Sequence, residues 1–164
     1  MDKKDLRILI GSGLLLLILL CVPEPIDEPN IEPIEEVETE IVEFVPEFYL
    51  SDEERQIVER IVMGESGGES YEGQVLVAQC ILNACLKDNI QPSEVRTKYG
   101  YSGWNEEPNE SVKKAVSAVF DDGYKVTDES VLYFYAPEVI TSNWHETQKF
   151  VTEVGGHRFF AEYR

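Results

Sequence analysis

The sequence predicts a helix-dominated α+β domain that follows two segments of different character. Apolar residues recur at helical spacing in several stretches between residues 52 and 120, and two short aromatic-rich runs bounded by Pro or Gly come after residue 130. The first 49 residues contain instead an apolar run and an acidic, Pro-rich stretch. A chain of 164 residues with 43% hydrophobic content therefore holds one folded domain, expected at 50–164, and these two appendages.

Residues 1–22 have the pattern of a membrane anchor or signal segment. An uncharged, almost wholly apolar run occupies residues 8–22 and follows Lys3, Lys4 and Arg7, so the basic end should stay in the cytoplasm. No pair of small residues marks a cleavage point, and Pro23 follows directly. We therefore expect an uncleaved anchor that holds the domain on the outer side of the membrane. A cleaved signal peptide and a lipid on Cys21 remain alternatives.

The second segment, residues 23–49, is expected to be a disordered acidic linker. Its first 25 residues hold five of the eight prolines and ten Asp or Glu, with no Lys or Arg. The whole chain has a formal net charge of −18, and residues 48–164 alone contain 20 acidic and 11 basic residues. An acidic chain without a basic patch repels phosphate, so we expect no binding of nucleic acid. We also expect a monomer.

The domain should begin with two helices. Ser51 and Glu54 form a capping box, and the apolar spacing that follows predicts a first helix over 52–63, ended by Gly64. A second helix over 72–86 is apolar on nearly every side, which is typical of a central helix surrounded by the rest of the fold.

The later elements are shorter. We expect a helical turn that begins at Pro92 and stops at Gly100, followed by an amphipathic helix that begins at Glu110 and ends at 121–123. After these helices we expect a strand near 132–135, a helical turn within 143–154 and a strand near 157–160. The two strands predict a small β-ribbon beside the helices.

One glutamate stands out in the stretch Gly64-Glu65-Ser66-Gly67-Gly68-Glu69. A carboxyl group held partly out of water by such a turn stays protonated near neutral pH and can act as a general acid, so Glu65 is the candidate catalytic residue. Glu69 is a possible assisting acid. It could instead place its charge at the N-terminus of the second helix, and this capping role is the favoured one.

Aromatic and polar side chains later in the chain are candidates for substrate binding. Flat rings against sugar faces and amides near N-acetyl groups, beside one acid, are typical of clefts that bind sugar polymers. Because a strand alternates its faces, two of the tyrosines could equally pack in the core. The candidates are Tyr101, Trp104, Tyr133, Tyr135, Asn143, Trp144 and His157.

Other chemistries lack their residues. The chain has two histidines, twelve positions apart, and no HExxH or CxxC motif, so we expect no metal and no cofactor. No G-x-S-x-G motif is present for a serine nucleophile. Cys80 and Cys85 lie in the apolar second helix and are interpreted as buried side chains rather than nucleophiles or a disulfide.

Several sequence blocks resemble the SleB-like cell wall hydrolases. The stretch that begins at Val58 reads VERIVMGESGGESYEGQVLVAQCILNACL and is similar to the family's A/G-E-x-x-G-E turn and Y/F-E-G-Q helix. LYFYAPE, SNW and GGHRFF follow in the family's order. Two positions depart from the pattern: Tyr101-Ser102-Gly103-Trp104 stands where the family has a Gln-Phe pair, and Ala136 replaces an Asn.

The resemblance implies a lysozyme-like domain of the lytic transglycosylase type. It implies cleavage of peptidoglycan glycan strands between N-acetylmuramic acid and N-acetylglucosamine, with Glu65 as the acid. A glycoside hydrolase normally needs a second carboxylate, and only Glu69 is a candidate, so we expect an intramolecular reaction that leaves a 1,6-anhydro end. Alternatives are an N-acetylmuramoyl-L-alanine amidase and a tethered, non-catalytic glycan-binding module.

Overall fold

The computed structural model describes residues 45–101 and 106–163. The chain divides between Glu40 and Ile41, and all described residues belong to the second part. Three expectations lie outside the described residues: the anchor at 1–22, nearly all of the linker, and the role of Trp104. Within those residues, no helix has the length and apolar character needed to cross a membrane.

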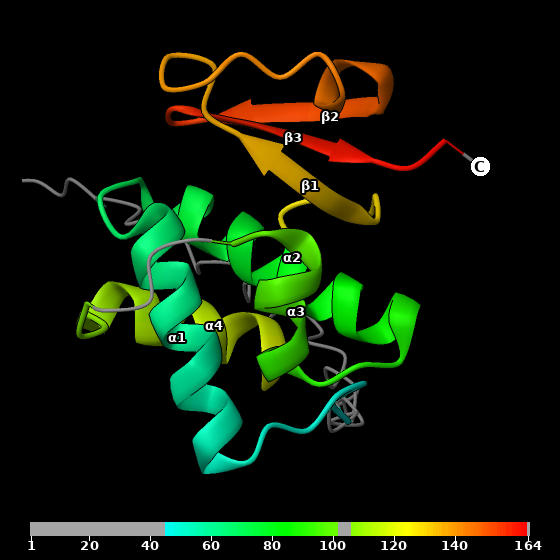
Figure 1. Cartoon of the computed structure of the whole chain (residues 1–164). Coiled ribbons are helices and arrows are strands. Elements are labelled where there is room, and N and C mark those ends of the chain that lie inside the picture. The colour runs from blue at the N-terminus through cyan, green and yellow to red at the C-terminus, as the bar shows by residue number, and fades with distance from the viewer. Residues whose placement is uncertain (1–44, 102–105, 164) are drawn as a thin grey trace, which may run out of the picture. The chain divides into compact units, whose positions relative to one another are not determined.

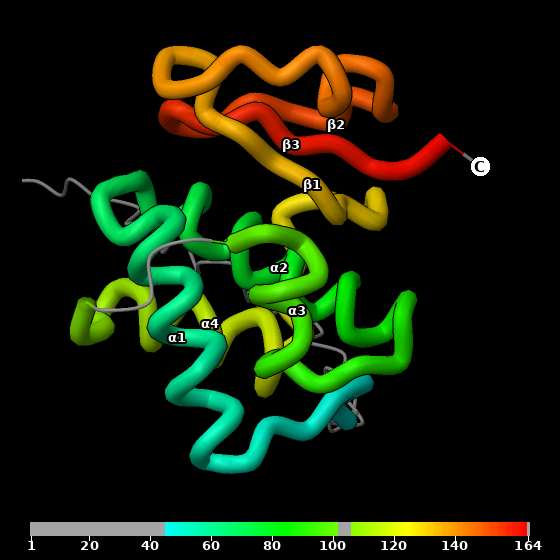
Figure 2. The backbone as a smooth tube through the Cα atoms, viewed as in Figure 1, coloured from blue at the N-terminus to red at the C-terminus, as the bar shows by residue number. Residues whose placement is uncertain are grey.

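In the described residues, four α-helices, one 3-10 helix and a small sheet make up the domain, which confirms the helix-dominated α+β prediction (Figure 1). The helices lie together, and the sheet covers them on the side of its first strand, as the tube in Figure 2 shows. The elements are α1 (Asp52–Ser66), α2 (Tyr71–Asp88), α3 (Pro92–Tyr99), α4 (Glu110–Phe120), β1 (Val131–Tyr135), the 3-10 helix η1 (His145–Thr147), β2 (Lys149–Val154) and β3 (His157–Ala161).

Helix α1 is longer than the sequence predicts. The capping box at Ser51 and Glu54 is confirmed, but the prediction that Gly64 ends the helix is wrong, because the helix continues to Ser66. A glycine inside a helix costs only about 1 kcal/mol, which packing can offset. Ser66 supplies that packing, since its side chain is buried and its hydroxyl donates to the Val62 carbonyl oxygen at 3.0 Å. The extension places Glu65 in the last helical turn.

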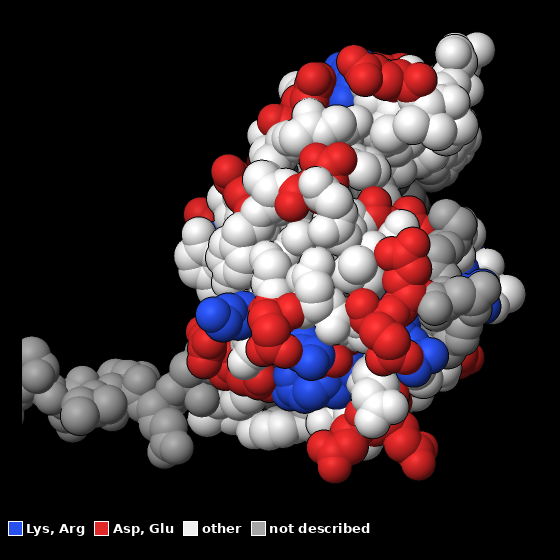
Figure 3. All heavy atoms as spheres, turned by 90° about the vertical axis from the view of Figure 1, so that its left-hand side faces the viewer, with Lys and Arg blue, Asp and Glu red and all other residues white. Residues whose placement is uncertain are grey.

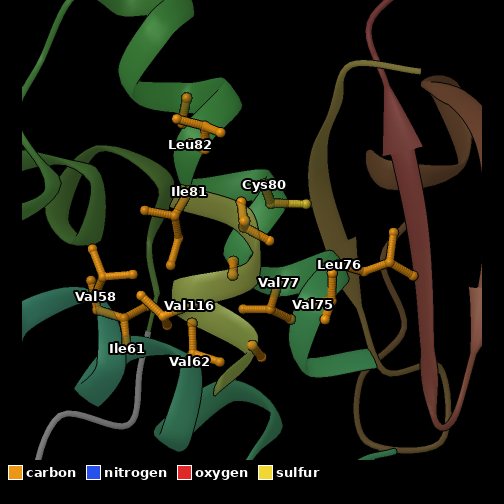
Figure 4. Packing of buried hydrophobic residues seen from close by; sticks show 14 of the residues in the cluster. Val58, Ile61, Val62, Val75, Leu76, Val77, Cys80, Ile81, Leu82 and Val116 are labelled. Carbon is orange, nitrogen blue, oxygen red and sulfur yellow. The ribbon is translucent and has the colours of Figure 1, made fainter. Parts of the chain in front are cut away.

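Helix α2 forms the centre of the core, as its all-round apolar pattern predicts. Its side chains pack on one side against Val58, Ile61 and Val116 of the neighbouring helices, while Leu76 points toward the sheet (Figure 4). Every residue from Gly73 to Leu82 is buried. Each fully buried Val, Leu or Ile side chain stabilises the fold by about 1.5–3 kcal/mol, so α2 is the main source of cohesion between helices and sheet.

Both domain cysteines are buried and unpaired, as predicted. Burial raises the pKa of the Cys85 thiol to about 12 and that of Cys80 further still. A thiol with so high a pKa is inert as a nucleophile at neutral pH, because the thiolate is the reactive form.

The sheet has three antiparallel strands in the order β1-β3-β2, one strand more than the predicted ribbon. The sequence predicts a helical turn within 143–154, and His145–Thr147 forms it, while Lys149–Val154 forms the unpredicted strand β2. This strand was missed because its side chains alternate only weakly between exposed and half-buried. The Gly155-Gly156 turn joins β2 to β3, and Gly155 has a φ of 61°, a conformation that glycine adopts without strain.

Candidate active site

A groove of about 1010 Å³ lies between the helices and the sheet. Its helical side comes from the C-terminal ends of α1, α2 and α3, and its other side comes from β1, the loop after β1 and the β2–β3 turn. The lining residues that matter for chemistry are Glu65, Glu69, Lys87, Asp88, Lys98, Tyr99, Tyr101, Tyr133, Phe134, Tyr135, Trp144, His145 and His157.

Glu65 lies at the helical side of this groove. Its side chain is half-buried, between the exposed Gly64 and the buried Ser66. The position follows from α1, because the last turn of that helix carries Glu65 beyond the apolar core residues Ile61 and Val62. The predicted acid is therefore a partly shielded carboxyl group that opens onto a groove.

The buried side chain of Gln74 holds the turn after α1 in place. This side chain is only 2% exposed, and its Nε2 donates to the carbonyl oxygens of Gly67 at 3.4 Å and Glu69 at 3.3 Å. Its Oε1 accepts a hydrogen bond from the Ser111 hydroxyl at 2.7 Å. Both polar atoms of the buried amide are thus paired, and Nε2 ties together two carbonyl groups of the turn between Glu65 and Glu69.

Glu69 does not cap α2, in contrast to the favoured expectation. The cap is Ser70, whose hydroxyl accepts a hydrogen bond from the Gly73 N–H at 3.3 Å. The Glu69 carboxylate reaches across to the sheet instead, where its Oε2 accepts from the Gly156 N–H at 3.0 Å. Its Oε1 lies 3.4 Å from Nδ1 of His157, close enough for an ion pair but without hydrogen-bond geometry.

A row of aromatic rings forms the floor of the groove. Tyr101 stacks on Phe134 with ring centroids 5.3 Å apart, and Tyr99 lies 6.2 Å from Tyr101 and stacks on Tyr133 at 6.0 Å. Trp144 then meets Tyr133 edge-on at 4.8 Å. Such rings offer the flat apolar surfaces against which sugar faces pack.

Tyr99 and Tyr133 are each held by an acid and a lysine. The Tyr99 hydroxyl donates to Asp88 at 2.7 Å, and Lys98 lies 2.9 Å from the same carboxylate. The Tyr133 hydroxyl donates to Glu162 at 2.7 Å, and Lys87 pairs with that carboxylate. The two stacked rings are thereby fixed as a rigid platform, and the hydrogen bonds together with the lysines lower the pKa of both carboxyl groups.

Tyr135 is more buried than Tyr133, with 7% exposure. Its ring stacks on Phe160 at 5.9 Å, and its hydroxyl donates to Glu146, which also pairs with Arg158 at 2.6 Å. Tyr133 therefore presents a groove surface, whereas Tyr135 mainly supports the sheet behind it.

The remaining predicted residues divide between the groove and the outside. Trp144 is 52% exposed at the groove rim and His157 is part of its wall, but Asn143 is exposed and does not line the groove. His145, whose Nδ1 lies 2.6 Å from the Ser142 hydroxyl, lines it as well.

Sequence reasoning missed Tyr99 and Phe134 as groove residues. The aromatic run of β1 signalled Phe134, although strand alternation argued for one face only. Tyr133, Phe134 and Tyr135 nevertheless all line the groove, although their pairing with β3 is regular and the one irregularity in the β1–β3 register lies before them, between Val131 and Tyr133. Tyr99 carried no signal, because it ends a helix whose packing the sequence does not reveal.

The described residues contain no group of three or more His, Cys, Asp or Glu side chains that could hold a metal ion. A half-buried acid beside a row of fixed aromatic rings, on a helix-dominated α+β domain, is typical of enzymes that act on sugar polymers.

Comparison with known proteins identifies the family. The model of the cell wall hydrolase family matches residues 68–160, so the chain belongs to this family. The matched region begins just after Glu65. Two curated relatives are spore cortex-lytic enzymes. The one from Oceanobacillus iheyensis is 32% identical over 124 residues, which cover 70% of this chain and 44% of the relative. The one from Bacillus cereus is 34% identical over 124 residues, which cover 70% of this chain and 46% of the relative. The chain thus spans less than half the length of these relatives.

A solved structure shares the fold at similar identity. It is the catalytic domain of the germination-specific lytic transglycosylase SleB from Bacillus anthracis, which is 32% identical and matches with a TM-score of 0.58. The similarity covers 71% of this chain and 100% of that domain.

Proposed function

We propose that this chain cleaves the glycan strand of peptidoglycan between N-acetylmuramic acid and N-acetylglucosamine, with Glu65 as the acid. The observation that carries the proposal is the position of Glu65, half-buried on the same groove as the rings of Tyr101, Tyr133 and Trp144. A sugar strand laid on these rings would bring a glycosidic oxygen to the acid. The names of the relatives, spore cortex-lytic enzyme and lytic transglycosylase, agree with this substrate.

The reaction we propose is a lytic transglycosylation. Glu65 donates its proton to the glycosidic oxygen, and the bond from that oxygen to C1 of the muramic acid breaks. The resulting carboxylate then takes the proton from the muramic acid's 6-hydroxyl as O6 bonds to C1, which leaves a 1,6-anhydro end and returns the acid to its starting form. Glu69 is occupied by Gly156 and His157, which favours this route over one that needs a second carboxylate.

Mass spectrometry of digested peptidoglycan tests the proposal. We expect anhydro-muropeptides from the whole chain and none from Glu65→Gln, because the amide cannot donate a proton. Glu72→Gln is a matched control, since Glu72 is exposed on the first turn of α2 and does not line the groove. Reducing sugar ends would indicate hydrolysis, free stem peptides an amidase, and absence of products a binding module. An active Glu65→Gln variant would remove the basis of the mechanism.

We also propose that residues 8–22 anchor the chain in the membrane with the domain on the wall side. The apolar run and the preceding basic residues support this location. Membrane fractionation of cells that express the full chain tests it, and a chain found wholly in the soluble fraction would argue against an anchor.

A further inference from the structure

Glu69 joins the two walls of the groove. It stands in the turn that follows α1, and its carboxylate contacts the turn between β2 and β3 through the Gly156 N–H and the His157 ring. We call this set of residues, Glu69, Gly155, Gly156 and His157, the clasp. The sequence separation between its two sides is 87 residues, so the contact belongs to the tertiary fold and not to either turn alone.

Gly155 is shaped to receive this carboxylate. A Cβ atom at Gly155 would lie 1.7 Å from Oε2 of Glu69, far inside any real contact distance. The positive φ of 61° at the same residue already favours glycine. The β2–β3 turn is thus complementary to the Glu69 carboxylate both in backbone conformation and in free space.

Each side of the clasp is tied to a catalytic or binding element. On the helical side, Gln74 holds the Glu69 carbonyl oxygen at 3.3 Å, four residues after Glu65. On the sheet side, the His157 ring packs edge-on against Phe134 with centroids 5.6 Å apart, and Phe134 stacks on Tyr101. A shift of the clasp would therefore move the aromatic floor relative to the acid.

We propose that Glu69 is a positioning residue that sets the distance between Glu65 and the sheet wall, and that it does not act as a second catalytic acid. This inference rests on the proposed function, because it assumes that the groove binds the glycan. Oε2 of Glu69 is already engaged by a backbone N–H, and Oε1 faces His157.

The Glu69→Gln and Glu69→Ala variants of the whole chain separate positioning from acid–base chemistry. The glutamine amide oxygen can still accept from Gly156, and its NH₂ can donate to a neutral His157 ring, so Glu69→Gln should keep kcat within about threefold of the wild type. Alanine breaks the clasp, and a displaced reacting geometry should lower kcat by about 10- to 100-fold. Both should give the wild-type anhydro product, with the same pH profile for Glu69→Gln.

The double variant Glu69→Ala with Gly155→Ala supplies an independent measure. In the wild type, Gly155→Ala adds backbone strain and also a collision between the new Cβ atom and the Glu69 carboxylate. In the Glu69→Ala background the carboxylate is gone, so only the strain remains. We expect Gly155→Ala to reduce kcat by a much larger factor in the wild type than in the Glu69→Ala chain. Equal factors in the two backgrounds would overturn the clasp.

The outcomes distinguish this inference from the proposed function. If Glu69→Gln lowers kcat as much as Glu69→Ala does, and the melting temperature is unchanged, then Glu69 is a catalytic acid and the positioning role is overturned. A fully active Glu69→Ala would overturn it as well. If Glu69→Ala does not fold, Glu69→Gln still decides, because a loss of kcat well beyond about threefold at an unchanged melting temperature would overturn the positioning role. Failure of the proposed function appears elsewhere, as an active Glu65→Gln or as products other than anhydro-muropeptides.

Discussion

The Tyr101 hydroxyl is buried beside the groove, and it has no hydrogen-bond partner among the described residues. Burial raises the pKa of Tyr101 well above 10, and the Glu65 carboxyl group contributes in the same direction, so the phenol stays neutral. A buried hydroxyl without a partner costs about 1–3 kcal/mol, which selection tolerates where the group has a use. The use we infer is donation to the bound glycan near Glu65.

Tyr101→Phe should therefore lower activity without lowering stability. Removal of an unpaired hydroxyl is neutral or raises the free energy of unfolding by up to about 1 kcal/mol, and loss of one hydrogen bond to substrate should reduce kcat/KM by about fivefold to tenfold. Thermal unfolding and peptidoglycan digestion measure the two effects.

Tyr99→Phe is the matched control for Tyr101→Phe. It removes a hydroxyl that donates to Asp88 at 2.7 Å, so it should destabilise the fold by about 1 kcal/mol. Equal losses of stability in the two variants would show that Tyr101 has a structural partner.

Residue type alone located several groove residues, although their roles stay predictions. Glu65 was found from its glycine-flanked sequence, and Tyr101, Tyr133, Trp144 and His157 from residue type, and all five line the groove. The partners of Glu69 could not be predicted, because Gly156 and His157 reach it only after the chain has folded over 87 positions.

At the scale of elements, the end of α1 decides where the acid lies. The helix ends at Ser66, and its C-cap is Gly67, whose backbone stays in the right-handed helical region with φ −59° and ψ −26°. A Cβ there would lie 2.4 Å from the Met63 carbonyl oxygen, whereas a Cβ at Gly68 would meet nothing within 4 Å. The first glycine is therefore required by packing, and the second is not.

This contrast predicts different outcomes for two adjacent Gly→Ala changes. Gly67→Ala should force the last turn of α1 to move, with a loss of about 1–3 kcal/mol in stability and about tenfold or more in kcat as Glu65 shifts. Gly68→Ala should change stability by no more than about 0.5 kcal/mol. Chemical denaturation and digestion assays on both variants check this, and similar effects at both positions would contradict it.

The loop between β1 and β2 carries a pH-dependent contribution. Burial lowers the pKa of His145 below 6.5, and Glu146 opposes this less strongly. Because the unfolded state takes up the proton more readily, the stability linked to His145 is present above pH 6.5 and is lost as pH falls through the lowered pKa.

We therefore expect His145→Asn to weaken the pH dependence of stability. Between pH 8 and pH 5 the denaturation midpoint should fall less in the variant than in the wild type. The carboxyl groups of Asp88 and Glu162, whose pKa values are lowered, titrate below this window. Parallel curves for the two proteins would show that His145 is not the group involved.

For the whole molecule, the helical part was predictable and the sheet only in part. Apolar spacing and caps located all four helices to within a few residues, because burial of one face is a local property of the sequence. Strand β2 depends on its pairing with β3, and the aromatic floor depends on contacts between the rings of α3 and β1, which local patterns do not encode.

Charge also acts at this scale. Asp and Glu side chains are spread over the face shown in Figure 3, with few Lys and Arg between them, and the chain has a net charge of −18. Peptidoglycan carries carboxylates on its stem peptides, so approach to the proposed substrate is opposed by like charge. Screening shortens this repulsion from a range of about 30 Å at 0.01 M salt to about 8 Å at 0.15 M.

Activity on isolated peptidoglycan should therefore rise with ionic strength. We expect kcat/KM to increase a few-fold between about 0.01 and 0.15 M salt, with kcat unchanged, because the repulsion affects encounter and not the bound state. Glu138→Gln neutralises an exposed carboxylate on the groove rim and should raise kcat/KM at low salt, whereas Glu72→Gln, outside the groove, should raise it less. Initial digestion rates across a salt series measure all three proteins. A rate that falls as salt increases would mean that attraction by the groove lysines Lys87 and Lys98 outweighs the acidic surface.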